Sequence, residues 1–211
     1  MKDTTRSILQ ELIGKNPTLK VCESAIEKAF SLLLETFKKN HKLLLCGNGG
    51  SAADREHIVG ELMKSFKKSR ALSNEEKEEL SQFEHGKILG DVLEKGVKAV
   101  SLTSHLSLST AFANDKEPSA VFAQQLYVLG NTGDCLLTIS TSGNSKNCVY
   151  AAEVAKWKGI TEIAMTGERE SKLSQMSDIC IRVPERETYK VQELHLPIYH
   201  CLCAMIEEEL F

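Results

Sequence analysis

Five short apolar runs constrain the fold of this 211-residue chain more than any other feature. Each run ends in small or turn-forming residues, and segments with apolar side chains at helical spacing lie between the runs. The runs cover residues 42–46, 99–102, 135–139, 160–166 and 179–183. Because apolar strands that alternate with helices form βαβ units, this pattern predicts an α/β fold around a parallel sheet that is buried on both faces.

Helical patterns lie at both ends of the chain and between the runs. Apolar residues at helical spacing predict two N-terminal helices, around residues 8–13 and 26–37, and one long C-terminal helix over residues 189–210. Inside that last helix, Pro197 removes a backbone hydrogen bond, which predicts a bend. Two further helices are expected over residues 120–129 and 147–158.

One charge-rich stretch interrupts this rhythm. Residues 67–98 predict two extra helices, inserted between the first βα unit and the second strand. The insertion is interpreted either as a solvated surface excursion or as a lid over a neighbouring site. No repeat and no low-complexity linker is evident, so the sequence predicts a single domain over residues 1–211 with this helical insertion.

Composition excludes several classes of protein. The 26 Lys+Arg against 29 Asp+Glu give a net charge of −3, which argues against sequence-blind binding to nucleic acid. No apolar run approaches the roughly 20 residues that cross a bilayer, and the first residues carry no apolar signal region. Seven cysteines without CxxC spacing predict buried free thiols. A cytoplasmic protein that contacts no membrane is therefore expected.

Three of the predicted strands are followed by loops rich in glycine and hydroxyl groups. These loops are GNGGSAAD (47–54), TSHLS (103–107) and STSGNS (140–145). Glycines allow backbone N–H groups to approach an anion, and ligands of open parallel sheets bind beyond the carboxyl ends of the strands. No lysine occupies the Walker position and no GxGxxG is present, so a phosphate monoester is a simpler ligand than a nucleotide. Each loop taken alone is equally consistent with a plain strand-to-helix turn.

Two pairs of polar residues lie at helical spacing. His57 and Glu61 are four residues apart just after the first loop, and Gln192 and His200 are eight apart on the C-terminal helix. If the two helices meet, these side chains could supply a base and an acid for proton transfer beside a carbonyl, or surround a zinc-type ion. Each pair taken alone is more typical of a solvated helix surface.

Six features of the sequence, taken in chain order, resemble the phosphoheptose isomerases of the sugar isomerase (SIS) fold class. They are CGNGGSAADREH, Glu61, SLTSHLSLSTAFAND, ISTSGNS, AMTG and VQELHLPIYH. The resemblance implies a three-layer α/β/α sandwich with a five-stranded parallel sheet. It also implies conversion of sedoheptulose 7-phosphate to D-glycero-D-manno-heptose 7-phosphate through an enediol. Members are homotetramers that build active sites between subunits, so the implied partners are a phosphosugar and further copies of the chain.

The resemblance assigns roles position by position. It implies that Glu61 is the general base and His200 the general acid. One Zn²⁺ per subunit is implied at His57, Glu61, Gln192 and His200. The residues implied to bind substrate and phosphate are Asn48, Gly49, Ser51, Ser140, Thr141, Ser142, Ser145 and Gln192.

Two departures from the family pattern leave the sugar open. His105 and Tyr189 stand where members carry aspartates, so an isomerase of another sugar phosphate is one alternative. A second is a non-catalytic SIS tetramer that binds a replication-initiation protein, which the ending CLCAMIEEELF resembles. A sugar-phosphate sensor of a transcriptional regulator is disfavoured, because residues 1–40 contain no basic recognition helix. The presence of both Glu61 and His200 favours the enzyme.

Overall fold

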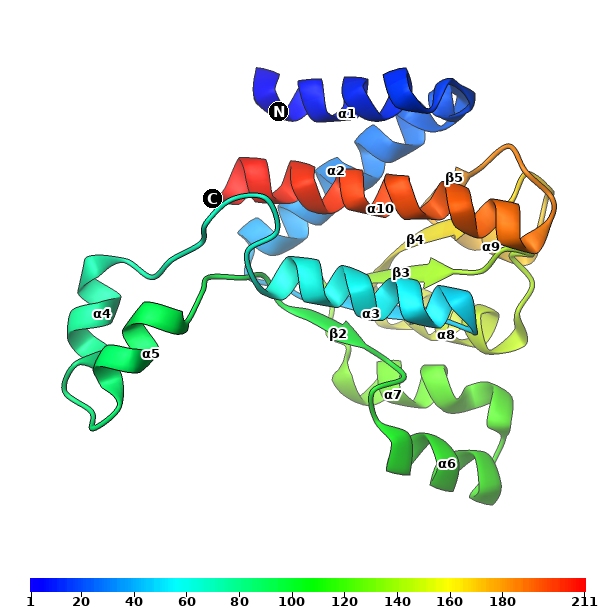
Figure 1. Ribbon diagram of the computed structural model, residues 1–211. Coiled ribbons are helices and arrows are strands. Elements are labelled where there is room, and N and C mark those ends of the chain that lie inside the picture. Colours follow the sequence, from blue (N-terminus) through cyan, green and yellow to red (C-terminus); the bar gives the residue numbers. More distant parts are fainter.

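Five parallel strands form one sheet in the computed structural model, which describes residues 1–211 (Figure 1). They are β1 (Leu43–Gly47), β2 (Ala99–Ser101), β3 (Cys135–Ile139), β4 (Thr161–Thr166) and β5 (Ile179–Arg182). Each predicted strand is confirmed to within one residue at its ends. The strand order is β2-β1-β3-β4-β5. Because the order reverses between β1 and β3, the loops after these two strands flank the place where open parallel sheets bind ligands.

Alternating side chains of the strands build two separate cores. Leu43 and Leu45 of β1 belong to the larger core, whereas Leu44 and Cys46 belong to the smaller core on the opposite face. All four are fully or almost fully buried. Successive side chains of a strand point to opposite faces, so a run that is apolar throughout requires cover on both sides.

Helices provide that cover and complete the predicted three-layer α/β/α sandwich (Figure 1). One layer contains α2 (Glu23–Lys38), α3 (Gly50–Met63) and α10 (Thr188–Leu210), with α1 (Asp3–Lys15) packed against α10. The other layer contains α7 (Val121–Leu129), α8 (Lys146–Lys158) and α9 (Lys172–Met176). Helix α6 (Leu106–Asp115) and the 3-10 helices η1 (Pro17–Cys22) and η2 (Pro118–Ala120) complete the elements outside residues 64–98.

The helices predicted at the two ends of the chain are confirmed. Helix α10 starts one residue before the predicted range and runs unbroken through Pro197 to Leu210. It lies beside α3 and runs in the same direction, since Gln192 packs on Gly50 and Glu207 lies against the end of α3 (Figure 1). The bend at Pro197 stays a prediction.

A helical arm projects from the sandwich between α3 and β2 (Figure 1). It consists of α4 (Asn74–Leu80) and α5 (Gly86–Val92), the two helices predicted for this stretch. The helices pack on each other, and a single antiparallel bridge between Ala71 and Glu94 closes the base of the arm. The arm follows the end of α3, whereas the GNGGS loop precedes its start, so within one chain the arm forms no lid over that loop.

The cysteines agree with the expectation of buried free thiols. Six of the seven free cysteines are buried, and Cys180 is half-buried. No helix of the structure combines the length and the apolar character needed to span a bilayer.

Candidate active site

A reciprocal pair of amides at the switch point joins the loop after β1 to the first turn of α8, which follows the loop after β3. Asn48 Nδ2 donates to Asn147 Oδ1 at 2.9 Å, and Asn147 Nδ2 donates to Asn48 Oδ1 at 2.8 Å. The strand ends themselves are in close contact, because a Cβ on Gly47 would lie only 2.8 Å from the carbonyl oxygen of Ile139. The structure thus brings together two segments whose paired amides are 99 residues apart in the sequence.

Hydroxyl groups line these two loops. Ser51 and Ser140 are buried, and the hydroxyls of Ser140 and Ser145 lie 3.0 Å apart. Ser142 Oγ accepts a hydrogen bond from the backbone N–H of Asn144 at 3.2 Å. A loop held in this way presents several hydroxyls in a fixed arrangement, which suits the oxygens of a phosphate group.

Two helices begin in these loops without a side-chain cap. Helix α3 starts at Gly50 after Gly49, which has φ +55°, and α8 starts at Lys146 after Ser145; neither Gly49 nor Ser145 makes a capping side-chain hydrogen bond. The first N–H groups of a helix lack partners within the helix and favour an anion. Thr141 lies in the loop after β3, and its carbonyl accepts a hydrogen bond from the backbone N–H of Gly167, which directly follows β4. Both helix starts are therefore available to a phosphate.

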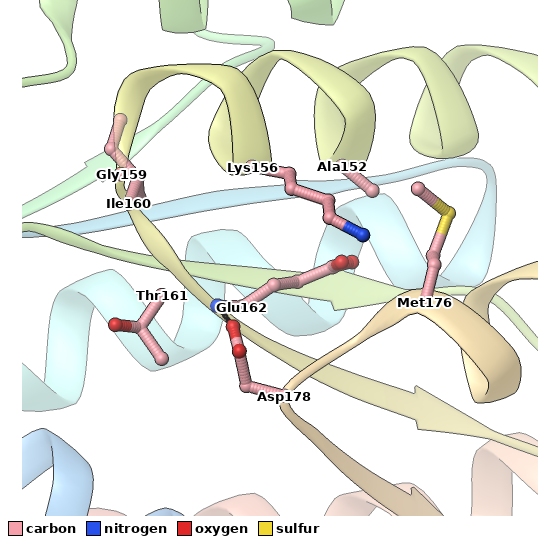
Figure 2. Close-up of a pocket in the computed structure, with 8 residues that line it drawn as sticks. All are labelled: Ala152, Lys156, Gly159, Ile160, Thr161, Glu162, Met176 and Asp178. Carbon is pink, nitrogen blue, oxygen red and sulfur yellow. Dashed lines mark hydrogen bonds between the residues drawn. The ribbon is translucent and has the colours of Figure 1, made fainter.

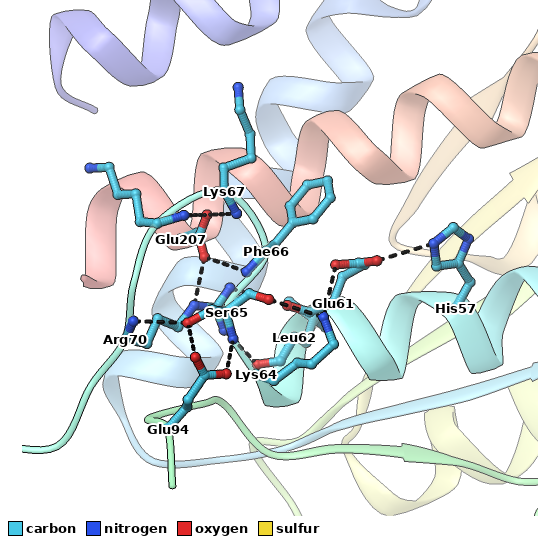
Figure 3. A network of polar contacts seen from close by, with 11 residues as sticks. His57, Glu61, Leu62, Lys64, Ser65, Phe66, Lys67, Arg70, Glu94 and Glu207 are labelled. Atoms are coloured by element: carbon cyan, nitrogen blue, oxygen red, sulfur yellow. Dashed lines mark hydrogen bonds and ion pairs between the residues drawn. The ribbon is translucent and has the colours of Figure 1, made fainter. Parts of the chain in front are cut away.

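Three of the predicted acid–base and zinc residues lie side by side on α3 and α10. His57 Nε2 is 3.1 Å from Oε1 of Glu61, one helical turn further along α3 (Figure 3). The ring of His200, on α10, packs edge-on against the ring of His57 with centroids 4.8 Å apart. Nε2 of His200 is buried and has no hydrogen-bond partner. The meeting of the two helices, which spacing could not establish, is thus observed.

Gln192 lies elsewhere on the same pair of helices. A Cβ on Gly50 would be 2.6 Å from Gln192 Nε2, so the amide packs on the first residue of α3. This place is two helical turns, about 10 Å along the axis, from His57. No group of three or more His, Cys, Asp or Glu side chains is placed to hold a metal ion within the chain. The predicted zinc ligands therefore do not form a ready site in one chain, although His57, Glu61 and His200 include the donor types that zinc prefers.

A hydrogen-bond chain that sequence reasoning missed orients His57. The phenol oxygen of Tyr199 lies 3.2 Å from His57 Nδ1 and donates to Asp54 Oδ1 at 3.3 Å. Asp54 stands one turn before His57 on α3, and Tyr199 directly precedes His200 on α10. The position of Asp54 was the available signal, because it shares a helical face with His57 and Glu61.

Burial shifts the pKa of two groups at or beside these hydrogen bonds, Asp54 and His200. It lowers the pKa of His200, and the neighbouring His57 lowers it further. Burial also raises the pKa of Asp54, an effect that the hydrogen bond from Tyr199 partly offsets. A lowered pKa favours the neutral imidazole of His200, which can still donate a proton from a ring N–H.

The end of β2 and the loop after it bind a carboxylate of α3 that the sequence analysis did not single out. Glu56 Oε1 accepts from the hydroxyls of Ser101 at 2.5 Å, Thr103 at 3.1 Å and Ser104 at 3.1 Å. His105 follows them as an exposed residue at the start of α6. Tyr189, the other departure from the family pattern, is exposed at the start of α10. Glu56 thus supplies a negative charge next to the position where an aspartate is absent.

A polar cavity lies at the end of the sheet opposite to these loops, where β4 and β5 begin (Figure 2). It has a volume of about 270 Å³, and Lys156 extends into it from α8. The buried Glu162 accepts from Thr138 Oγ1 at 2.7 Å, while Asp178 accepts from the backbone of Glu162 at 2.8 Å. This cavity lies apart from the loops at the carboxyl ends of the strands and contains none of the predicted site residues.

The chain is similar to known proteins over most of its length. The family model described as "SIS domain" matches residues 16–82 and 90–167. The phosphoheptose isomerase of Aneurinibacillus thermoaerophilus is 35% identical over 214 residues, which cover 100% of this chain and 96% of that protein. The chain belongs to the phosphoheptose isomerase family of SIS-domain proteins. Phosphoheptose isomerase 2 of Campylobacter jejuni is 37% identical and matches 88% of this chain and 81% of its own length.

Solved structures of phosphoheptose isomerases share the fold over the whole chain. The structure from Francisella tularensis superposes with a TM-score of 0.76 at 30% identity and covers 99% of this chain and 100% of its own. Phosphoheptose isomerase GmhA from Neisseria gonorrhoeae gives a TM-score of 0.74 at 30% identity, with 98% of both chains covered. The family and the fold predicted from the sequence motifs are confirmed. The relatives with at least 30% identity named here are phosphoheptose isomerases, so the non-catalytic alternative is not favoured.

Proposed function

We propose that this protein is a phosphoheptose isomerase that converts sedoheptulose 7-phosphate to D-glycero-D-manno-heptose 7-phosphate. One observation carries the proposal: Glu61 and His200 both lie against His57 where α3 and α10 pack together, on helices that also border the hydroxyl-rich loops, in a chain with phosphoheptose isomerase relatives along its whole length. The loops hold the phosphate through Ser51, Ser140, Thr141, Ser142 and Ser145, with Asn48 and Gly49 beside them. Phosphate binding far from the reacting carbons holds and orients the sugar.

The reaction moves one proton between adjacent carbons of the sugar. Glu61 takes a proton from C1 of the ketose, the electrons of that C–H bond form the C1–C2 double bond, and the carbonyl oxygen at C2 receives a proton from His200. The product of this step is a neutral enediol. In the second step the carboxyl of Glu61, whose proton exchanges with solvent at the enediol stage, protonates C2, and the C1 hydroxyl gives its proton to His200 as the aldehyde forms. The side chains end in their starting states, so no redox cofactor takes part.

The experiment that tests this proposal is conversion in D₂O followed by NMR. Purified protein is incubated with sedoheptulose 7-phosphate, and a heptose 7-phosphate with deuterium at C2 is expected. The Glu61→Gln variant serves as the control, because it removes the base without changing the shape of the side chain. If the protein converts a different ketose phosphate but not this one, the substrate is wrong and His105 and Tyr189 become the residues to examine. If no ketose phosphate in a panel is converted, the isomerase itself is wrong.

We also propose that the assembled protein holds one Zn²⁺ per subunit at His57, Glu61, Gln192 and His200. The donor types of His57, Glu61 and His200, and the unpartnered Nε2 of His200, support this proposal. When bound, such an ion would polarise the carbonyl group of the substrate. Elemental analysis of the purified protein tests the proposal. Protein without zinc that keeps full turnover in the presence of a chelator would refute it.

Self-association into a homotetramer with sites between subunits is a further proposal. Its support is the arm, where Phe83, Ile88 and Val92 have 68%, 65% and 64% of their surfaces exposed although all three are apolar. Apolar surface of this kind is typical of protein–protein contacts. Light scattering coupled to gel filtration is expected to give a mass four times that of the chain. A monomeric mass at micromolar concentration would contradict this proposal.

We place the protein in the cytoplasm. The buried free thiols support this location, since disulfides are rare there. Cell fractionation followed by immunoblotting tests it, and recovery in a periplasmic or membrane fraction would count against it.

A further inference from the structure

A buried ion pair joins the end of α3 to α10. Arg70, which follows α3 at the base of the arm, donates from Nε to Oε1 of Glu207 at 2.7 Å, and the side chains are 0% and 1% exposed (Figure 3). The guanidinium also lies over the ring of Phe211, 4.6 Å from its centroid. Both charges are therefore removed from water, and they need several further hydrogen bonds to offset the loss of hydration.

Arg70 makes its further hydrogen bonds to the last turn of α3. Its Nη1 donates to the carbonyl of Leu62 at 2.9 Å and its Nη2 to the carbonyl of Glu61 at 3.1 Å. The last carbonyls of a helix have no partner within the helix, and a positive charge there is favoured. The backbone of the proposed base is thus held directly by this guanidinium.

Glu207 makes its further hydrogen bonds to the segment that connects α3 to the arm. Its carboxylate accepts from the backbone N–H groups of Phe66 at 2.9 Å, Lys67 at 2.7 Å and Lys68 at 3.0 Å. The ring of Phe66 in turn lies 5.8 Å from that of His200. Since Glu207 is seven residues after His200, both project from nearly the same face of α10, two turns apart.

We infer that Arg70 and Glu207 are positioning residues for the isomerase reaction, because they fix the helix of the base to the helix of the acid. This inference rests on the proposed function and adds to it two residues that contact neither the carboxylate of Glu61 nor the imidazole of His200. Apolar packing holds α3 and α10 together but is non-directional. The pair instead fixes five backbone groups at defined distances, which sets how α3 lies along α10. Arg70 acts through the backbone of Glu61, and Glu207 acts through the segment that contains Phe66.

The test uses variants that separate positioning from stability. Arg70→Met removes the guanidinium, and Arg70→Met/Glu207→Gln removes both charges while the amide oxygen still accepts from the backbone. Leu33→Ala, a core substitution on α2 away from the pair, is the matched control for loss of stability. Each variant is measured for Tm, for kcat and KM with sedoheptulose 7-phosphate, and for amide hydrogen exchange over residues 58–70. Arg70→Lys is the conservative variant.

The expected result is a fall in kcat of about 30- to 100-fold for Arg70→Met and for the double variant, with KM changed less than about threefold, since misplacement by about 1 Å has effects of this size. Arg70→Lys should recover part of kcat, because an ammonium can pair with Glu207 but cannot also hold both carbonyls. Leu33→Ala should lower Tm at least as much and keep kcat. A double variant with the kcat of the unsubstituted protein would overturn the inference.

Hydrogen exchange separates this inference from the proposed function. If the unsubstituted protein shows no turnover, the proposed function fails, and exchange alone then decides about the pair. Arg70→Met is expected to speed exchange over residues 61–68 by at least about tenfold, whereas Leu33→Ala is not. Unchanged exchange in this segment of Arg70→Met would overturn the inference whatever the activity.

Discussion

The phenol oxygen of Tyr199 on α10 lies 3.2 Å from Nδ1 of His57 on α3. This contact and the one from Tyr199 to Asp54 connect the two helices at the level of the proposed base. Because His57 Nε2 faces Glu61, the contact at Nδ1 decides how the imidazole presents its other nitrogen. The orientation of His57 therefore depends on a tyrosine that follows it by 142 residues.

Tyr199→Phe tests this relationship. Loss of the hydroxyl removes the partner of His57 Nδ1 and leaves the ring in place, so kcat is expected to fall by about tenfold with little change in KM. Stability should fall by about 1 kcal/mol, the typical contribution of one hydrogen bond. Steady-state kinetics and thermal unfolding measure the two effects. Tyr127→Phe, which removes the hydroxyl of a half-exposed tyrosine on α7, is the matched control. Equal kinetics in both variants would contradict the orienting role.

Glu61→Gln is expected to lower kcat by about 10²- to 10⁴-fold, the usual contribution of a general base. The change keeps the size of the side chain, so the fold should be retained, as measured by circular dichroism. Uptake of deuterium at C2 should fall in parallel with turnover. A variant that exchanges and turns over at the original rate would remove Glu61 from the mechanism.

Ser142→Ala is expected to raise KM with little effect on kcat, because it removes a phosphate contact that is made equally in the ground state and the transition state. A hydrogen bond to a charged group contributes roughly 1.5–3 kcal/mol, which corresponds to an increase of about tenfold or more. Initial-rate kinetics over a range of substrate concentrations measure it. Ser119→Ala, on η2 outside the two loops, is the control. A fall in kcat alone would show that Ser142 acts in the chemical step instead.

Glu162 should contribute a loss of stability as pH rises from 5 to 8. The buried His195 opposes it, because burial lowers the pKa of that imidazole to about 4 and stability from this group therefore increases with pH. Burial raises the pKa of the Glu162 carboxyl to about 7, and the neighbouring Asp178 adds to the effect. Because the pKa in the folded state is above that in the unfolded state, the folded protein binds the proton more tightly. The resulting stabilisation is complete below about pH 4.5 and is lost as pH rises through about 7. The contribution lost is about 3 kcal/mol, at roughly 1.4 kcal/mol for each pH unit.

Glu162→Gln should remove this contribution, because the amide keeps an acceptor for Thr138 and cannot ionise. Urea unfolding at pH 5 and at pH 8 gives the free energy of unfolding at each pH, and the difference between these two free energies is the quantity compared. Glu153→Gln, which removes an exposed carboxylate of α8, is expected to keep it. A pH dependence that is the same in Glu162→Gln as in the unsubstituted protein would show that other groups cause it.

The strands and the loops rich in glycine and hydroxyl groups could be predicted from local sequence. A strand such as β3 is apolar at every position except Thr138, and such a run is stable only when it is covered on both faces, so the pattern determines both the element and its layer. The loops were predictable for a related reason. Glycine and hydroxyl residues directly after an apolar run lie at the carboxyl end of a parallel strand, where the loops of neighbouring strands meet. Glu61 and His200 were singled out by spacing and by resemblance to a family.

The residues that orient and connect the site were not predictable in this way. Tyr199 reads as one more apolar residue of a helix, and Glu56 and Arg70 read as charges on a solvated surface. Tertiary structure buries Arg70 and pairs it with Glu207, 137 residues away. Helical spacing shows which residues share a face but not which face meets another helix, and it was the packing of α10 along α3 that decided this. The sequence by itself determined the layers, the loops and the candidate base and acid. Only the tertiary structure determined how they are held, because burial and long-range hydrogen bonds depend on where distant segments come together.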